Sequence, residues 1–300
     1  MPYNSVVLVK QVPDTANITG KAMKEDGTVN RAALPAIFNP EDLNALEMAL
    51  QVKDAHGGQV TVLTMGPPRA AEVLREALYR GADRVILITD RKTAGSDTLA
   101  TSYVLQHAVE RFAREFGDYD LVFCGRQAID GDTAQVGPQV AEKLGLPQIT
   151  YAEEIESLQD GEIVVRRALP LGTETVRCPL PCLLTVVASA NEPRPPSVRR
   201  VLAYKLAATP LEYASLLKQW PEFGDEDSLD RYLAERGLRI TVWNGADVGV
   251  DYERVGLSGS PTQVLKVDFV VLESTDSKEI TPDAEGLTAL MRELIAEHIL

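Results

Sequence analysis

The stretch that decides the fold is residues 120–138, which read DLVFCGRQAIDGDTAQVGP. It begins with a short apolar run that ends at a glycine, which is typical of a buried parallel strand. After a turn of small and polar residues, Val136, Val140 and Leu144 recur at helical spacing, and Gly145 marks the stop. The stretch therefore predicts a strand, a turn and a helix in succession.

A turn of this kind presents free backbone N–H groups, and the dipole of the following helix adds positive potential. Phosphate or pyrophosphate is the ligand expected at such a turn. The spacing matches neither the Walker A motif nor the GxGxxG fingerprint. From spacing alone, an ordinary strand-to-helix loop therefore stays open as the alternative.

Outside this stretch the chain alternates between apolar, β-branched runs and helical periods. The expected strands are 5–9, 59–65, 84–89 and 120–124, and the expected helices begin near 40, 70, 97 and 136. This alternation predicts a doubly wound, mostly parallel α/β sheet. Ligands of such sheets lie beyond the carboxyl ends of the strands, where Lys10, Met65 and Gly125 fall. We expect one nucleotide site at that edge.

From about residue 149 the pattern changes to short strands with turn signals, which predicts an antiparallel addition returning to the main sheet. Residues 191–200 are proline-rich and basic, so no regular structure is expected there. Two short helices are expected within 209–238. The chain is thus divided into 1–190, 191–238 and 239–300.

Two helix starts are well signed. Asn39 is expected to cap a helix with Pro40 at its first position. Thr281 and Pro282 are expected to play the same roles for the last helix, whose apolar face ends at Ile295.

Composition excludes several classes. The formal net charge of −14 argues against a nucleic-acid partner, and no apolar run approaches the roughly 20 residues of a membrane span. Cys124, Cys178 and Cys182 are odd in number and lack a zinc spacing, which favours a reduced, cytoplasmic protein. The first strand follows Met1 closely, so no signal peptide is expected.

Few residues are candidates for acid–base catalysis. Asp130 and Asp132 are candidates for a general base or for magnesium ligands, but shaping the turn is the favoured role because no histidine accompanies them. No catalytic residue and no metal site is therefore expected. A nucleotide-binding protein without such groups lets its cofactor supply the chemistry, and a flavin fits that description.

The stretch 120–138 closely resembles the signature of electron-transfer flavoprotein β subunits. The resemblance also covers VKQVPDT at 9–15, NPED at 39–42, TMGPP at 64–68, AGSDTLATS at 94–102 and GSPT at 259–262. These blocks span most of the chain. They imply an adenine-nucleotide α-hydrolase-like fold with an antiparallel addition and a C-terminal arm.

Members of this family form a heterodimer with a larger α subunit that holds its own FAD. The β subunit binds AMP in ordinary members and a second FAD in electron-bifurcating members. Such dimers carry electrons between acyl-CoA dehydrogenases or related enzymes and other carriers. The resemblance therefore implies an α subunit as the partner of this chain.

The resemblance implies roles for the matching positions. Leu8 and Met65 would flank the adenine, Asn39 and Asp42 would bond adenine or ribose, and the turn at 132–138 would hold the phosphates. The full implied cofactor set is Leu8, Val9, Lys10, Asn39, Asp42, Met65, Gly66, Asp97, Thr98, Thr101, Gly125, Arg126, Gln127, Ala128, Asp130, Gly131, Asp132, Thr133, Ala134, Gln135, Val136, Gly137 and Pro138.

The family also docks on its dehydrogenase through a loop after the last core strand, which matches 191–201 here. Val198 lies near the family's leucine anchor, and Arg194, Arg199 and Arg200 favour an acidic surface. The paired prolines and arginines depart from the family's pattern. Residues 209–238 resemble an insertion, and the arm at 239–300 is expected to dock on the α subunit.

The signature favours FAD over AMP. Gly131, Thr133, Ala134 and Val136 are small where ordinary members carry bulkier or more polar residues, and a flavin needs the extra volume. This resembles the bifurcating and nitrogen-fixation-associated (Fix-like) members. Two further sets carry expected roles: Asp97, Thr98 and Thr101 toward the ribityl chain or pyrophosphate, and Lys10 and Arg126 as positive charge near the flavin.

The reaction implied for the bifurcating group oxidises NADH. One electron goes to a low-potential ferredoxin or flavodoxin, and the other goes to an acyl-CoA dehydrogenase-type or quinone-reducing partner. An ordinary β subunit with AMP is the first alternative. A nucleotide-binding module or hydrolase without redox activity is the second.

Overall fold

The computed structural model describes residues 2–14, 35–263 and 279–297. The chain divides into two compact units, Met1–Leu265 and Lys266–Leu300. The first unit holds the sheet and its helices, and the second holds the helix α10, Ala284–Ala296.

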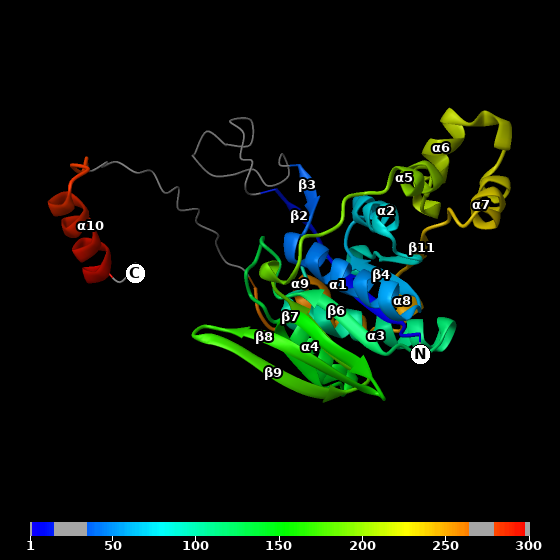
Figure 1. Cartoon of the computed structure of the whole chain (residues 1–300). Helices are drawn as coiled ribbons and strands as arrows, with labels where there is room; N and C mark the ends of the chain where they lie inside the picture. The colour runs from blue at the N-terminus through cyan, green and yellow to red at the C-terminus, as the bar shows by residue number, and fades with distance from the viewer. Residues whose placement is uncertain (1, 15–34, 264–278, 298–300) are drawn as a thin grey trace. The chain divides into compact units, whose positions relative to one another are not determined.

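The first unit is built on a nine-stranded sheet in the order β11-β5-β4-β1-β6-β10-β7-β8-β9 (Figure 1). Its parallel strands are β1 Ser5–Val9, β4 Val60–Met65, β5 Arg84–Ile88, β6 Leu121–Gly125, β10 Cys182–Val186 and β11 Thr241–Trp243. Strand β7 Gln148–Gln159 pairs parallel with β10, and the antiparallel addition follows from it: β8 Glu162–Leu169 pairs antiparallel with β7, and β9 Gly172–Pro179 pairs antiparallel with β8. A separate two-stranded ribbon pairs β2 Gln11–Pro13 with β3 Ala36–Phe38. The mostly parallel α/β sheet with an antiparallel addition is confirmed.

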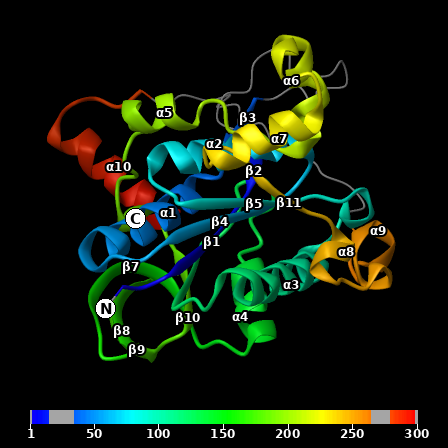
Figure 2. The same cartoon turned by 90° about the vertical axis from the view of Figure 1, so that its right-hand side faces the viewer.

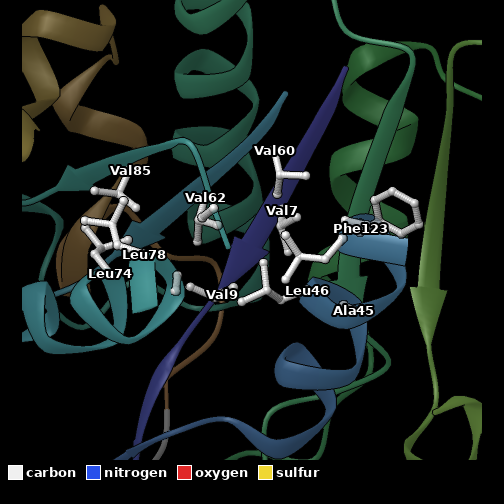
Figure 3. Close-up of a cluster of buried hydrophobic side chains, with 14 of the residues drawn as sticks. Val7, Val9, Ala45, Leu46, Val60, Val62, Leu74, Leu78, Val85 and Phe123 are labelled. Carbon is white, nitrogen blue, oxygen red and sulfur yellow. The ribbon is translucent and has the colours of Figure 1, made fainter. Parts of the chain in front are cut away.

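Helices cover both faces of the sheet (Figure 2). Helices α1 Pro40–His56 and α2 Ala71–Arg80 lie on one face, and α3 Thr98–Phe116 and α4 Val136–Leu144 lie on the other. Valines of the strands meet leucines of α1 and α2 in the core (Figure 3). Burial on both faces explains why the strands read as continuous apolar runs.

The shorter helices follow β10 or fill turns. The remaining α-helices are α5 Val198–Tyr204, α6 Tyr213–Gln219, α7 Glu226–Glu235, α8 Gly245–Val248 and α9 Gly256–Gly259. The 3₁₀ turns are η3 Pro68–Ala70, η4 Arg91–Thr93, η5 Ala188–Ala190, η6 Pro210–Glu212, η7 Pro221–Phe223 and η8 Tyr252–Arg254. The two helices expected within 209–238 are thus confirmed as α6 and α7.

The segment after α7 rejoins the sheet. Strand β11 pairs with β5 along Thr241↔Ile86 to Trp243↔Ile88. The compact unit therefore continues to Leu265 and includes residues that the sequence placed in a C-terminal arm.

Three local expectations are corrected. Asn39 lies at the N-cap position of α1, but its side chain makes no cap hydrogen bond because it bonds elsewhere. Val198 is the first residue of α5 and not part of an irregular loop. The last helix begins at Ala284, because the Asp283 carboxylate accepts hydrogen bonds from the N–H groups of Glu285 and Gly286.

Candidate functional site

Three neighbouring parallel strands end at one edge of the sheet. Strand β1 lies between β4 and β6, with Val9 paired to Thr64 and Leu8 paired to Cys124. Lys10, Met65 and Gly125 therefore come together, as the sequence predicts. The strand order changes direction between β1 and β6, which is where open α/β sheets place their ligands.

Asp42 ties two of these strand ends together. Its carboxylate accepts hydrogen bonds from the N–H groups of Lys10 and Gly125, both at 2.8 Å. The side chain is buried, and burial raises the pKa of Asp42 to about 7 although those two N–H groups act to lower it. Each carboxylate oxygen of Asp42 therefore accepts a hydrogen bond from the backbone.

Asn39 and Glu41 hold the loop that follows Gly125. Glu41 accepts a hydrogen bond from the N–H of Gln127 at 3.0 Å. Asn39 accepts one from the N–H of Ile129 at 3.1 Å and donates one to the carbonyl of Gln127 at 2.8 Å. Asn39 is fully buried, so its amide is fixed against this loop.

The turn before α4 presents a row of backbone donors. The N–H groups of residues 133–137 have no hydrogen-bond partner among the residues that the structure describes. Asp132 and Ala134 have positive φ angles of 48° and 52°, while Gln135 is right-handed. This alternation turns successive N–H groups toward a common point, which forms an anion-binding nest at a helix N-terminus.

Two glycines of the signature are required by packing. A Cβ on Gly125 would lie 2.6 Å from an Asp42 oxygen, and a Cβ on Gly137 would lie 2.6 Å from the Cys124 sulfur. Gly131 differs, because a Cβ there would meet no atom of the described residues within 4 Å. The turn is thus closely packed underneath and open above Gly131.

The charged side chains of the site have partners. The Lys10 ammonium lies 2.7 Å from Asp130, and the Arg126 guanidinium lies 2.9 Å from Glu41. Asp132 accepts a hydrogen bond from Gln127 at 2.9 Å. The positive charge expected from Lys10 and Arg126 is therefore largely balanced by neighbouring carboxylates.

The N-terminus of α3 is capped by its own residues. Asp97 accepts a hydrogen bond from the Ala100 N–H at 2.9 Å and two from Thr262 at 2.7 and 3.0 Å. Burial acts to raise the pKa of Asp97, but these hydrogen bonds outweigh it and hold the pKa below its ordinary value. Thr98 donates to Gln135 at 3.0 Å, which joins α3 to the turn before α4. Thr101 lies within hydrogen-bond reach of the Ser96 carbonyl.

The apolar members of the expected set differ in burial. Leu8 is 5% exposed and belongs to the core cluster on the α3 and α4 face, while Val9 belongs to the cluster on the opposite face. Met65 is half-buried at the end of β4. The Gly66 N–H donates to the carbonyl of Ile88. The structure thus brings these residues to the edge but commits the Leu8 side chain to the core.

The expected docking residues fall into two groups. Arg194 is paired with Glu47 and Asp54 of α1 at 2.8 Å, and Arg200 donates to the carbonyl of Leu78 at 2.5 Å at the end of α2. Val198 and Arg199 are exposed on α5, and Val198 is 75% exposed.

Sequence reasoning missed several contacts in this site. Gln139 carries a buried side-chain oxygen without a partner in the described part of the chain, next to Thr98. Thr185 accepts a hydrogen bond from the N–H of Tyr151, whose φ of 59° places its half-exposed ring at this edge, 5.9 Å from the Arg126 guanidinium. The sequence indicated only that Tyr151 lies in a strand, and it gave no signal for these contacts.

Two negative findings concern the described ranges alone. Within 2–14, 35–263 and 279–297, no three His, Cys, Asp or Glu side chains gather as a metal site. Among the helices that are described, none has the length and apolar character needed to cross a bilayer.

Residues 26–211 match the family model described as the electron transfer flavoprotein domain. A protein named FixA from Sinorhizobium fredii is 44% identical over 265 residues, which cover 87% of this chain and 81% of that protein.

Two further relatives are covered, like this chain, over most of their length. The electron transfer flavoprotein subunit beta of Clostridium acetobutylicum is 40% identical over 298 residues, 99% of this chain and 100% of that protein. The subunit CarD of the caffeyl-CoA reductase-Etf complex of Acetobacterium woodii is 41% identical over 262 residues, 87% of this chain and 86% of that protein.

Proposed function

The chain belongs to the electron transfer flavoprotein family as a β subunit, and from this premise we propose that it binds FAD and works in a heterodimer that bifurcates electrons from NADH. The observation that carries the nucleotide part is the row of N–H groups at 133–137, which have no partner within the described part of the chain. A phosphate or pyrophosphate supplies the anionic oxygens that these donors require.

The residues present fit such a group. The nest lies at the N-terminus of α4, and the space above Gly131 is open. Ala134 holds a left-handed backbone that a non-glycine residue adopts at a cost of about 1 kcal/mol, and such strain is common in ligand-binding turns. The N–H groups of residues 133–137 would hold the phosphates, and Gln127 and Asp132 would keep the turn in shape.

FAD is proposed over AMP because the space beside the nest is open. AMP occupies an adenine pocket and one phosphate position, whereas FAD continues beyond the phosphates. The open space at Gly131 and the exposed Thr133 leave room for that continuation. When bound, FAD would supply one-electron and two-electron redox chemistry, which the described side chains lack.

The remaining residues of this chain would bind and orient. Asp97 holds the N-terminus of α3 and links it to Thr262, and Thr98 links α3 to Gln135. Lys10 and Asp130 form an ion pair beside the nest, so a bound anionic ligand would meet a polar and charge-balanced wall. In the proposed reaction NADH loses two electrons and a proton; one electron passes to a ferredoxin or flavodoxin and the other to a high-potential acceptor.

The proposed partners follow from the family. We propose an α subunit as the permanent partner, with α10 as part of the contact, because Leu287, Met291 and Ile295 form an exposed apolar stripe on that helix. We propose that the acyl-CoA dehydrogenase-type or quinone-reducing partner contacts α5, where Val198 and Leu202 are exposed one helical turn apart.

The test is to purify the heterodimer, denature it and quantify the released nucleotides. About two FAD per heterodimer without AMP supports the proposal. One FAD with one AMP supports the ordinary electron-transferring alternative and rejects bifurcation through this subunit. One FAD without AMP is the amount that the α subunit alone accounts for, and this result would reject a nucleotide site in this subunit.

A further inference from the structure

Side chains of the segment Asn39–Asp42 accept hydrogen bonds from every second backbone N–H group between Gly125 and Ile129. The N–H of Gly125 donates to Asp42, the N–H of Gln127 to Glu41 and the N–H of Ile129 to Asn39. Three side chains at the start of α1 thus accept hydrogen bonds from alternate N–H groups of residues 125–129, and the N–H of Arg126 between them donates to the carbonyl of Val186. The loop is therefore tied both to α1 and to β10.

The fixed segment leads directly into the nest. The carbonyl of Ala128 accepts hydrogen bonds from the N–H groups of Gly131 and Asp132, which closes the turn. Asp132 then takes its left-handed φ of 48°, and the N–H groups at 133–137 follow, with no partner in the ranges that the structure describes. The direction in which the nest opens is therefore set by where Ala128 is held, between Gln127 and Ile129.

The same side chains have little left to offer a ligand. Both Asp42 oxygens accept backbone N–H groups, and Asn39 uses its oxygen and its amide nitrogen on the loop. Glu41 also bonds Arg126. Exposure agrees, because Asn39, Glu41 and Asp42 are 0%, 7% and 6% exposed.

We propose that Asn39, Glu41 and Asp42 are positioning residues: they brace the loop 125–129 so that the N–H groups at 133–137 converge on phosphate, and their side chains do not bond the nucleotide. This deepens the proposed function and rests on its nucleotide site. The 39–42 segment, which resemblance alone places at the adenine or ribose, instead acts through the phosphate turn.

The brace consists of contacts within this chain alone, which makes hydrogen–deuterium exchange of the heterodimer the sharpest test. In the nucleotide-free protein, peptides spanning 125–131 are expected to exchange slowly, because alternate N–H groups are bonded. The N–H groups of residues 133–137 are expected to exchange fast without nucleotide and slowly after addition of FAD or AMP.

Variants of Glu41 separate the acceptor from the charge. Glu41→Gln keeps an oxygen for the Gln127 N–H, so it should leave exchange at 125–131 slow and the dissociation constant for FAD or AMP within about threefold. Glu41→Ala removes the acceptor and should speed exchange at 125–131 in the nucleotide-free protein, with the dissociation constant raised about tenfold. Asp42→Asn should act like Glu41→Ala, and Glu142→Ala on the exposed face of α4 is the matched control.

Each outcome decides the proposal. Weaker binding by Glu41→Ala with unchanged exchange of the nucleotide-free protein would mean that Glu41 contacts the ligand directly, and would overturn the brace. Unchanged binding together with unchanged exchange would overturn it too. Should Asp42→Asn fail to fold, the two Glu41 variants decide alone. If the unaltered heterodimer binds neither FAD nor AMP, the proposed function fails, while exchange at 125–131 still tests the brace.

Discussion

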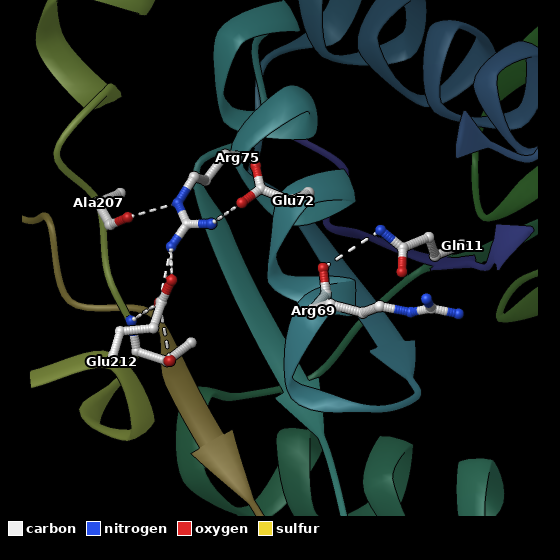
Figure 4. A network of polar contacts seen from close by, with 7 residues as sticks. Gln11, Arg69, Glu72, Arg75, Ala207 and Glu212 are labelled. Carbon is white, nitrogen blue, oxygen red and sulfur yellow. Dashed lines mark hydrogen bonds and ion pairs between the residues drawn. The ribbon is translucent and has the colours of Figure 1, made fainter. Parts of the chain in front are cut away.

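The guanidinium of Arg75 in α2 donates two hydrogen bonds to the carboxylate of Glu212, at 2.5 and 2.6 Å, across 137 positions of sequence (Figure 4). Arg75 also donates to the carbonyl of Ala207 at 2.7 Å and to Glu72 at 2.7 Å. Its side chain is only 11% exposed. One buried cation therefore holds the start of the segment with α6 and α7 on the core.

Arg75→Met is expected to lower the free energy of unfolding by about 2–3 kcal/mol, because Glu212 and the Ala207 carbonyl lose a buried charged donor. The control is Arg177→Met, since the pair Arg177–Glu162 is 70% and 47% exposed and is expected to contribute less than about 1 kcal/mol. Urea unfolding of both variants measures the difference. Equal losses would show that Arg75 does not anchor this segment.

Gly137 and Gly131 offer a second matched pair. Gly137→Ala places a methyl group 2.6 Å from the Cys124 sulfur and 3.0 Å from Thr185, and is expected to cost about 1–3 kcal/mol by displacing the start of α4. Gly131→Ala meets open space and is expected to change stability by less than about 0.5 kcal/mol. Thermal unfolding of the two variants gives the comparison, and an equal effect would contradict the packing argument.

The strand, turn and helix at 120–145 could be predicted because their signals are local: an apolar run, small polar residues and a helical period ending at Gly145. The convergence of Lys10 and Gly125 on one edge follows from the rule for parallel sheets. These parts of the site depend on pattern and topology, which the sequence carries.

The role of Asn39 could not be predicted, because its partners lie 88 and 90 positions away at Gln127 and Ile129. The sequence correctly placed Asn39 at the N-cap position of α1, but the capping hydrogen bond that this position predicts is not formed. Arg194 and Arg200 show the same limit. A basic, proline-rich stretch indicates exposed charge, whereas tertiary contacts direct these two side chains to α1 and to the end of α2.

Asp42 makes stability depend on pH. Its pKa is raised from 3.8 to about 7 in the folded protein, mainly by burial. Between these two values the folded state binds a proton that the unfolded state has lost, so the free energy of unfolding is expected to fall as pH rises from about 4 to about 7, by at most about 4 kcal/mol from this group. Asp42→Asn removes the titrating group. Unfolding of both proteins across this range should show the difference between them shrink as pH rises, and parallel curves would contradict the assignment.

Helix α5 carries the docking prediction. Val198 and Leu202 are 75% and 63% exposed and lie on one face, so a partner's pocket can cover both. Val198→Ala with Leu202→Ala is expected to slow electron transfer to the partner dehydrogenase about tenfold while the bound nucleotide stays in place. Leu171→Ala is the control, because Leu171 is fully exposed on the β8–β9 turn. Loss of nucleotide from the double variant would show that α5 supports the nucleotide site instead.

Helix α10 carries the assembly prediction. Leu287, Met291 and Ile295 are 56%, 48% and 57% exposed and recur every fourth residue, which is the spacing of a helix that lays one face into a partner's groove. Replacing all three by serine is expected to weaken binding of the α subunit about a hundredfold, since three apolar side chains lose their burial. Truncation at Thr281 should act in the same direction.

The control for α10 is Arg292→Ala, which changes an exposed residue of the same helix and leaves the apolar stripe intact. Co-purification with the α subunit, followed by a titration of subunit dissociation, measures each variant. The serine variant should separate from the α subunit at concentrations where the Arg292 variant stays bound. If both variants bind equally well, the stripe does not face the α subunit, because three apolar contacts cannot be removed from an interface without a loss of affinity.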